Sequence, residues 1–291
     1  MDRGYITLMK LAGAICFLVI NQVDELPRVS IKSALKNTDL PILVGYISDD
    51  DISSLRDLPV QFVRILEVES PSRSGNYSAF DQDEFYRIVM NKWGLLLQNL
   101  RQYDFLVYSD IDVIWIQDAA REISRIFESR KDKDLVIQSF GNDEVNPSLC
   151  MGFLGIRNSD NSVEFLNLCK LRHSEMIIDN PRIGDDEIAT MVMKEKGQPD
   201  WLQRLSPVYF PVGNVLTLFT SKPTFPGLVA PTPFIFHLNY VVGLENKRLM
   251  MRVLSRYNNS WAIESKMTFK WFLKLRMKEL KFWLGTLRRR L

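Results

Sequence analysis

The sequence predicts an α/β protein with a mostly parallel sheet flanked by helices, and two observations support this fold class. Short apolar runs alternate with longer amphipathic segments over the first half of the chain, as in repeated strand–helix units. The first run, AICFLVI at residues 14–20, contains no polar residue, which is typical of a strand covered on both faces. At 291 residues the chain can bury a core of this size.

The expected elements follow one another with little interruption. In the first half we expect strand 14–20, helix 27–37, strand 41–47, strand 61–68, helix 82–102 and strand 104–109. In the second half we expect the apolar run 113–116, helix 118–129, strands 134–140 and 150–156, helices 159–174 and 184–196, strand 233–240 and helix 244–256. The proline-rich region 205–236 is expected to be mostly loop.

The N-terminal apolar run allows a second interpretation, as a signal or membrane anchor. It extends from Leu11 to Ile20, only about half of the length that a membrane-spanning helix needs. Lys10 interrupts any longer run, and no small-residue cleavage site follows. We therefore favour a buried strand.

Charge and cysteine content limit the classes of function. The net charge is only +2, which gives no reason to expect nucleic-acid binding. The three cysteines show no metal-site spacing, so we expect reduced core residues and a cytoplasmic location. Residues 266–291 differ sharply, with nine Lys or Arg against one Glu.

Two aspartates interrupt the most apolar part of the sequence, DFLVYSDIDVIWIQD at residues 104–118. Burying a lone carboxylate costs several kcal/mol, so Asp110 and Asp112 need a compensating partner. Both follow a predicted strand, where ligands bind in open α/β sheets, and hard oxygen atoms suit Mg²⁺ or Mn²⁺. The alternative is a surface turn with two solvated carboxylates.

His237 is one of only two histidines and follows an apolar strand in FHLNYVVGLENK. A neutral imidazole there is a suitable third ligand for Mn²⁺. The alternative is a histidine that is satisfied by a backbone carbonyl. The other histidine, His173, is expected on the surface of a helix.

The segment YDFLVYSDIDVIWIQD resembles the Asp-x-Asp segment of retaining GT-A nucleotide-diphospho-sugar glycosyltransferases, the group related to glycosyltransferase families 8 and 77. This resemblance implies the Rossmann-like GT-A fold and metal contacts from both Asp110 and Asp112, with Asp110 also near the ribose. A similar late element in the family pairs a histidine with a glycine and a lysine. Here Gly243 and Lys247 match it, at longer spacing, as expected contacts to the donor phosphates.

The resemblance also assigns residues further from the aspartate pair. Asp185 and Asp186, which open a predicted helix, match an acidic dyad that faces the sugar, although relatives place glutamine where Asp186 stands. Acids are also favoured at any helix N-terminus by its dipole. Lys92 would reach the donor phosphates or sugar, unless it is simply solvated, and Asn21 after the first strand is a candidate contact to the base or ribose.

The C-terminal segment is expected to form a basic, aromatic-rich amphipathic helix. Its apolar stripe lies beside a stripe made of Lys270, Lys274, Lys278 and Lys281. Such a helix suits an anionic membrane surface, but it could equally pack on the catalytic domain. We divide the chain into a transferase domain, residues 1–258, and this tail, residues 259–291.

The leading hypothesis is a Mn²⁺- or Mg²⁺-dependent glycosyltransferase that moves a sugar from a nucleotide diphosphate, UDP being favoured, to a glycan, a glycolipid or another hydroxyl acceptor. The resemblance implies retention of anomeric configuration. One alternative is a sugar nucleotidyltransferase, although NQVDELP replaces the glycine-rich loop expected after the first strand. Another alternative is a non-catalytic module that binds a membrane surface. If the chain is instead an enzyme, the same tail would make it a peripheral membrane protein.

Overall fold

The computed structural model describes residues 12–20, 25–66, 83–140, 148–197, 199–212 and 233–239, together with residues 245, 247, 248 and 251. The strands are β1 (Gly13–Leu18), β2 (Ile42–Tyr46), β3 (Gln61–Arg64), β4 (Phe105–Ser109), β5 (Val113–Trp115), β6 (Leu135–Ser139), β7 (Leu149–Arg157), β8 (Leu202–Arg204) and β9 (Ile235–His237). The helices are α1 (Glu25–Asn37), the 3₁₀ helix η1 (Asp49–Leu55), α2 (Asp83–Leu100), α3 (Ala119–Ser129), α4 (Asp160–Asp179) and α5 (Asp185–Glu195).

Seven of these strands form one sheet in the order β3-β2-β1-β4-β7-β6-β8. Strands β3, β2, β1 and β4 run parallel to one another, and β6 is parallel to β8. Only β7 runs antiparallel to both of its neighbours, β4 and β6. The predicted mostly parallel α/β sheet is therefore confirmed.

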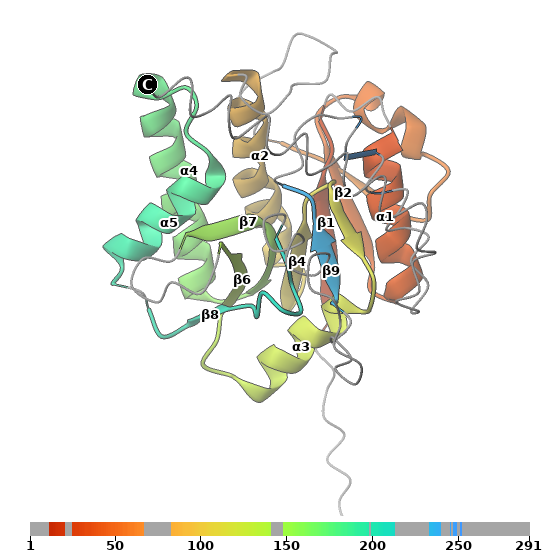
Figure 1. Cartoon of the computed structure of the whole chain (residues 1–291). Helices are drawn as coiled ribbons and strands as arrows, with labels where there is room; N and C mark the ends of the chain where they lie inside the picture. The colour runs from red at the N-terminus through yellow and green to blue at the C-terminus, as the bar shows by residue number, and fades with distance from the viewer. Residues whose placement is uncertain are drawn as a thin grey trace, which may run out of the picture. The chain divides into compact units, whose positions relative to one another are not determined.

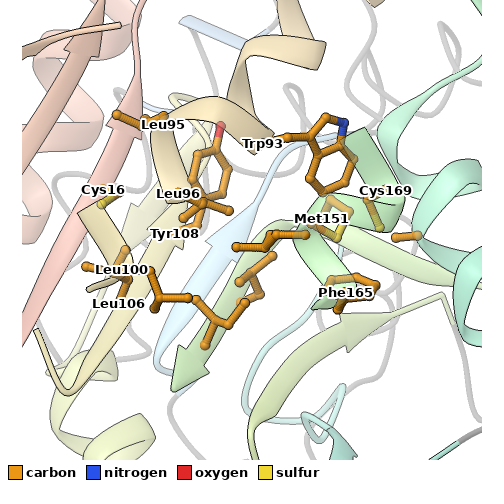
Figure 2. Close-up of a cluster of buried hydrophobic side chains, with 14 of the residues drawn as sticks. Cys16, Trp93, Leu95, Leu96, Leu100, Leu106, Tyr108, Met151, Phe165 and Cys169 are labelled. Carbon is orange, nitrogen blue, oxygen red and sulfur yellow. The ribbon is translucent and has the colours of Figure 1, made fainter. Parts of the chain in front are cut away.

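Helices cover both faces of this sheet (Figure 1). Successive β1 residues point to opposite faces, so Ala14 and Cys16 join one buried cluster while Ile15 and Phe17 join another. The first cluster packs the sheet against α2, α4 and α5, and Figure 2 shows Trp93 of α2 and Phe165 of α4 within it. The second packs the sheet against α1 and α3. This double coverage explains why the first strand is apolar throughout.

Two helices begin at residues that satisfy free backbone N–H groups. The Asp118 side chain accepts a hydrogen bond from the Arg121 N–H, and the Ser159 side chain accepts one from the Ser162 N–H. Such caps explain why α3 and α4 begin within one residue of their predicted starts. Helix α4 continues to Asp179, five residues beyond the prediction, because Met176 and Ile177 still pack against the core.

A second, two-stranded sheet pairs β5 antiparallel with β9. Val113 lies opposite His237 in this pair, and the Leu238 N–H donates a hydrogen bond to the Asp112 carbonyl at 3.1 Å. The pairing therefore brings the late histidine to the segment that carries the aspartates.

Some expectations differ from the structure or lie outside the described residues. His173, expected on the surface, is fully buried between α2 and α4, and accepts a hydrogen bond from Trp93 at 3.0 Å. Strand β8 was not predicted. Asn21, Gly243 and the tail 259–291 lie outside the described residues. Among the helices that the structure describes, none has both the length and the apolar character required to cross a bilayer.

Candidate active site at the carboxyl end of β4

Asp110 and Asp112 lie where the chain leaves β4 and turns into β5. The Asp110 N–H donates to the Gly152 carbonyl of β7 at 2.8 Å, which continues the β4–β7 pairing by one residue. The Val113 N–H then donates back to the Asp110 carbonyl at 3.2 Å and closes a turn. Because of this turn, both carboxylates face the same region.

His237 of β9 completes a cluster with these aspartates. Its Nε2 atom lies 3.3 Å from Asp112 Oδ1 and 3.9 Å from Asp110 Oδ2. One potential ligand atom from each residue lies within 4.8 Å of the other two, close enough for all three to contact one cation. Sequence reasoning predicted these three residues as a metal site, and the structure brings them together.

The imidazole of His237 is buried, and its two nitrogens have different surroundings. Nδ1 lies 3.0 Å from the side-chain oxygen of Gln138 on β6. Nε2 is completely buried and makes no well-aligned hydrogen bond among the described residues, although Asp112 Oδ1 lies 3.3 Å away. A buried polar atom without a partner is costly, so its position between two carboxylates is the observation that fits a bound cation.

Gly152 provides the space in which this cluster is packed. A Cβ atom added at Gly152 would lie 2.0 Å from His237 Cε1 and 2.7 Å from Asp110 Oδ2. No side chain can occupy that volume while the histidine and the aspartate keep their positions. The glycine is therefore required by close approach rather than by its backbone angles.

The two aspartates have different electrostatic environments. Burial raises the pKa of Asp110 above its ordinary value, although the nearby ammonium of Lys92 opposes this effect. Burial also acts to raise the pKa of Asp112, but Lys247 and His237 together outweigh it and lower that pKa far below its usual range. Asp112 is consequently anionic under all ordinary conditions, as a metal ligand should be.

Lys92 is buried at the centre of the site and is not a solvated lysine. Its ammonium contacts the Asp185 carboxylate, donates to the Met151 carbonyl at 3.1 Å and lies 3.5 Å from Asp110 Oδ1. It also lies over the ring of Tyr108, 4.5 Å from the ring centroid. These contacts join helix α2 to the metal-binding candidates and to the start of α5.

The predicted acidic dyad divides its contacts between this lysine and the backbone of β7. Asp185 pairs with Lys92, whereas Asp186 accepts a hydrogen bond from the Met151 N–H at 2.5 Å. That N–H is available because the β6–β7 register shifts, so that Ile137 pairs with Leu154 but Gln138 pairs with Cys150. Burial and the neighbouring Asp185 raise the pKa of Asp186 well above its ordinary value.

Lys247 lies beside Asp112, and its ammonium pairs with that carboxylate rather than with Asp185. Its predicted contact with the donor phosphates stays a prediction. Asn21 and Gly243, predicted to contact the donor, lie outside the described residues, so their roles stay predictions.

Sequence reasoning missed two residues that shape the site. Tyr108 donates a hydrogen bond to Asp110 Oδ1 at 2.8 Å, and Gln138 contacts His237. Gln138 had a detectable signal, because it is the polar residue inside the apolar run DLVIQSF. Tyr108 had none, since tyrosine is common in buried strands.

A separate hollow of about 380 Å³ lies near the amino ends of β6 and β8, away from the aspartate cluster. It is lined by Arg130, Lys133, Pro199, Asp200, Leu202, Gln203 and Arg204. It shares no residue with the candidate active site.

Comparisons with known proteins bear on the family and the fold of the chain. The model of a family described as nucleotide-diphospho-sugar transferase matches residues 52–251, well over half of the chain. No curated protein sequence matches the chain.

Two solved structures share the fold. The galactosyltransferase LgtC, in complex with donor and acceptor sugar analogs, is 14% identical with a TM-score of 0.53, over 85% of this chain and 98% of LgtC. The glycosyltransferase GlyE of Streptococcus pneumoniae TIGR4 is 16% identical with a TM-score of 0.54, over 88% of this chain and 63% of GlyE. At such identities the likeness shows the fold alone, which is the predicted GT-A fold.

Proposed function

Since this chain belongs to the nucleotide-diphospho-sugar transferase family, we propose that it is a metal-dependent glycosyltransferase that uses a UDP-sugar as donor. The acceptor in this proposal is a hydroxyl group of a glycan or glycolipid, and the anomeric configuration of the sugar is retained. The sugar nucleotidyltransferase and the non-catalytic binding module remain as outcomes of the test below.

The observation that carries the proposal is the arrangement of Asp110, Asp112 and His237. Two carboxylates and one buried imidazole nitrogen without a hydrogen-bond partner lie within reach of one ion. This set of two oxygen atoms and one nitrogen atom suits Mn²⁺, and Mg²⁺ less well. A bound Mn²⁺ would neutralise charge on the diphosphate and so ease its departure.

The other residues of the site would act on the two ends of the donor. Lys247, which already lies beside Asp112, would place its ammonium near the diphosphate and stabilise the charge that develops there. Lys92, which lies 3.5 Å from Asp110 and pairs with Asp185, would contact the sugar together with the Asp185–Asp186 dyad. Asn21 and Gly243 would contact the nucleoside and the phosphates, as the sequence predicts.

The tail supplies a sequence-based reason to extend the proposal. Residues 266–291 carry a net charge of +8, and we propose that the tail holds the enzyme peripherally on the cytoplasmic, anionic face of a membrane. Such a location would suit a glycolipid acceptor.

Thermal unfolding of the full chain tests the proposed function directly. We would measure the melting temperature with Mn²⁺ alone, with UDP alone and with both together. A ligand that binds only the folded state stabilises it by mass action, and two ligands that share one site do so jointly. We expect a clear rise only with both, about 2.7 kcal/mol when the ligand is present at 100 times its Kd.

Asp112→Asn is the test variant and Asp39→Asn, an exposed aspartate on the surface, is its matched control. Asp112→Asn should lose the joint stabilisation, while Asp39→Asn should keep it. Equal stabilisation of both variants would contradict the metal site.

Donor hydrolysis then separates the enzyme classes. Nucleotide sugars are incubated with the enzyme and Mn²⁺ without acceptor, and UDP release is followed over hours. A glycosyltransferase should hydrolyse its own donor slowly, whereas a nucleotidyltransferase should instead release pyrophosphate from a nucleoside triphosphate and a sugar phosphate. A binding module should do neither.

A further inference from the structure

The side-chain amide of Gln138 has an orientation that its surroundings fix. Gln138 is fully buried in β6, and its Nε2 group donates hydrogen bonds to the carbonyls of Phe210 at 3.0 Å and Pro211 at 3.4 Å. A backbone carbonyl can only accept hydrogen bonds, so the amide nitrogen must face these two groups. The amide oxygen therefore points away from them, toward His237.

This orientation determines which nitrogen of His237 carries the proton. The amide oxygen of Gln138 lies 3.0 Å from Nδ1 and can only accept, so Nδ1 must be the protonated nitrogen. In a neutral imidazole the other nitrogen, Nε2, then has a free lone pair. That lone pair faces the carboxylates of Asp110 and Asp112, and Nε2 has no hydrogen-bond partner in the part of the chain that the structure describes.

We propose that Gln138 is a positioning residue that holds His237 in the Nδ1–H tautomer and so presents the Nε2 lone pair to a divalent cation. The inference rests on the proposed function for the identity of the ligand. The tautomer itself is a property of the metal-free protein and can be measured separately. Partners in this position generally affect metal affinity by about 10–100-fold.

Cys150 provides a competing contact that would favour the other tautomer of His237. Its Sγ atom lies 3.5 Å from the same Nδ1 nitrogen, and a thiol is a weak donor. If the acceptor at Gln138 were absent, the Cys150 S–H could donate to a bare Nδ1, and the imidazole proton would then lie on Nε2. His237 protonated at Nε2 could not bind a cation there.

The chain contains an internal control, because its other histidine is held in the opposite tautomer. The Trp93 indole N–H donates to His173 Nδ1 at 3.0 Å, so the proton of His173 lies on Nε2, which is 3.1 Å from the Ile183 carbonyl. With two histidines in the sequence, the imidazole region of an ¹⁵N spectrum contains only two sets of signals.

The experiment is long-range ¹H–¹⁵N NMR of the full chain labelled with ¹⁵N-histidine and freed of metal by a chelator. His237→Asn assigns the two sets of signals. We expect the Nδ1–H pattern for His237 and the Nε2–H pattern for His173. An Nε2–H pattern for His237 in the wild type overturns the proposal.

Two variants of Gln138 separate control of the tautomer from a structural effect. Gln138→Met and Gln138→Glu both lose the amide donors to Phe210 and Pro211, but only glutamate keeps an acceptor facing Nδ1. We expect Gln138→Met to shift His237 toward the Nε2–H tautomer and to weaken Mn²⁺ binding about 10–100-fold. Gln138→Glu should keep the Nδ1–H tautomer and bind Mn²⁺ more tightly than Gln138→Met, and His173 should be unchanged in both.

Mn²⁺ binding is measured with UDP present, because the proposed site is expected to bind the two together, by electron paramagnetic resonance of the free ion against a blank of Mn²⁺ and UDP without protein; it does not require turnover. If Gln138→Met keeps the Nδ1–H tautomer, or if Gln138→Glu loses it, the role of Gln138 is overturned. If Gln138→Met fails to fold, the tautomers of His237 in Gln138→Glu and in the wild type still test the role of Gln138.

The two proposals fail in distinguishable ways. If the wild type has the Nδ1–H tautomer but binds no Mn²⁺, the proposed metal site is wrong. The tautomer would then not serve to bind a cation. A wild type with the Nε2–H tautomer that still binds Mn²⁺ overturns only the role of Gln138.

Discussion

Lys92 has only 1% of its surface exposed, although a lysine side chain normally keeps its ammonium in water. Burial alone would lower the pKa of this ammonium, but Asp110 and Asp185 outweigh that effect and raise the pKa above its ordinary value. The lysine is thus held charged by the same carboxylates that it neutralises. Removing it would leave two partly buried carboxylates without their ammonium partner.

Lys92→Met should therefore destabilise the protein by about 3–5 kcal/mol, which is typical for breaking a buried ion pair from one side. Lys32→Met is the matched control, because Lys32 is also within a helix but exposed, and it should change stability by less than about 0.5 kcal/mol. Denaturant unfolding of both variants measures the difference. Equal, small effects would contradict the central role of Lys92.

Gly152→Ala should disturb the metal site, because the added methyl group overlaps the His237 ring and the Asp110 carboxylate. We expect a loss of about 1–3 kcal/mol of stability, as for other overpacked cores, and a weaker affinity for Mn²⁺. Titration of Mn²⁺ into the folded variant measures the second effect.

Gly184→Ala is the control for this substitution. It lies at the start of α5, where an added Cβ meets only Tyr86 Cε1 at 3.8 Å. It should cost about 1 kcal/mol or less, as a change at a helix cap, and leave Mn²⁺ affinity unchanged. If both alanine variants bind Mn²⁺ as the wild type does, then close packing at Gly152 is not needed for the site.

At the scale of elements, the site depends on the irregular part of β7 and on the start of α5. The register shift between β6 and β7 releases the Met151 backbone from the ladder. Its N–H then binds Asp186 and its carbonyl accepts from Lys92. One local irregularity in a strand therefore orients residues from two different helices.

Asp186→Asn tests the electrostatics of this junction in metal-free protein. Because the pKa of Asp186 is raised in the folded state, the folded protein binds more protons than the unfolded one above about pH 4. The wild type should then lose stability as the pH rises through the raised pKa. The asparagine variant lacks this ionisation and can still accept from the Met151 N–H.

We therefore expect the stability of Asp186→Asn relative to the wild type to increase between pH 4 and pH 8, measured by urea unfolding at each pH. Asp39→Asn corrects for the general effect of removing one surface carboxylate. A relative stability that stays constant or falls over this range would show that burial of Asp186 does not raise its pKa.

At the scale of the whole molecule, the charge of the chain is divided unevenly. The net charge is +2, but residues 266–291 carry +8, which leaves about −6 for residues 1–265. An anionic surface would therefore attract the tail and repel the rest of the chain.

Replacing Lys270, Lys274, Lys278 and Lys281 by glutamine in the full chain should weaken binding to vesicles that contain phosphatidylserine. Each basic residue near such a surface contributes about 1 kcal/mol, so we expect a loss of well over tenfold in vesicle affinity. Flotation with anionic and neutral vesicles measures it.

The control variant replaces four exposed lysines outside the tail by glutamine: Lys32, Lys36, Lys131 and Lys194. It should bind anionic vesicles as the wild type does. Equal losses in both variants would point to net charge alone, and no binding by the wild type would rule out the membrane role of the tail.

The sequence by itself determined the fold class and much of the site. A continuous apolar run indicates a strand that is buried on both faces, and this signal lies within the strand itself. Strands β1 and β4 could therefore be predicted from their own residues. A carboxylate inside such a run needs a partner wherever the chain folds, which is why Asp110 and Asp112 could be recognised in isolation.

Only the tertiary structure decided which partners these residues have. Lys92 and His173 could not be recognised as buried, because their partners, Asp185 and Trp93, come from other helices. His237 reaches the aspartates only because two three-residue strands, β5 and β9, pair across a long stretch of chain. The hydrophobic periodicity of a segment indicates how that segment is buried. The pairing of two distant strands depends instead on how the whole core packs, and no single segment determines that.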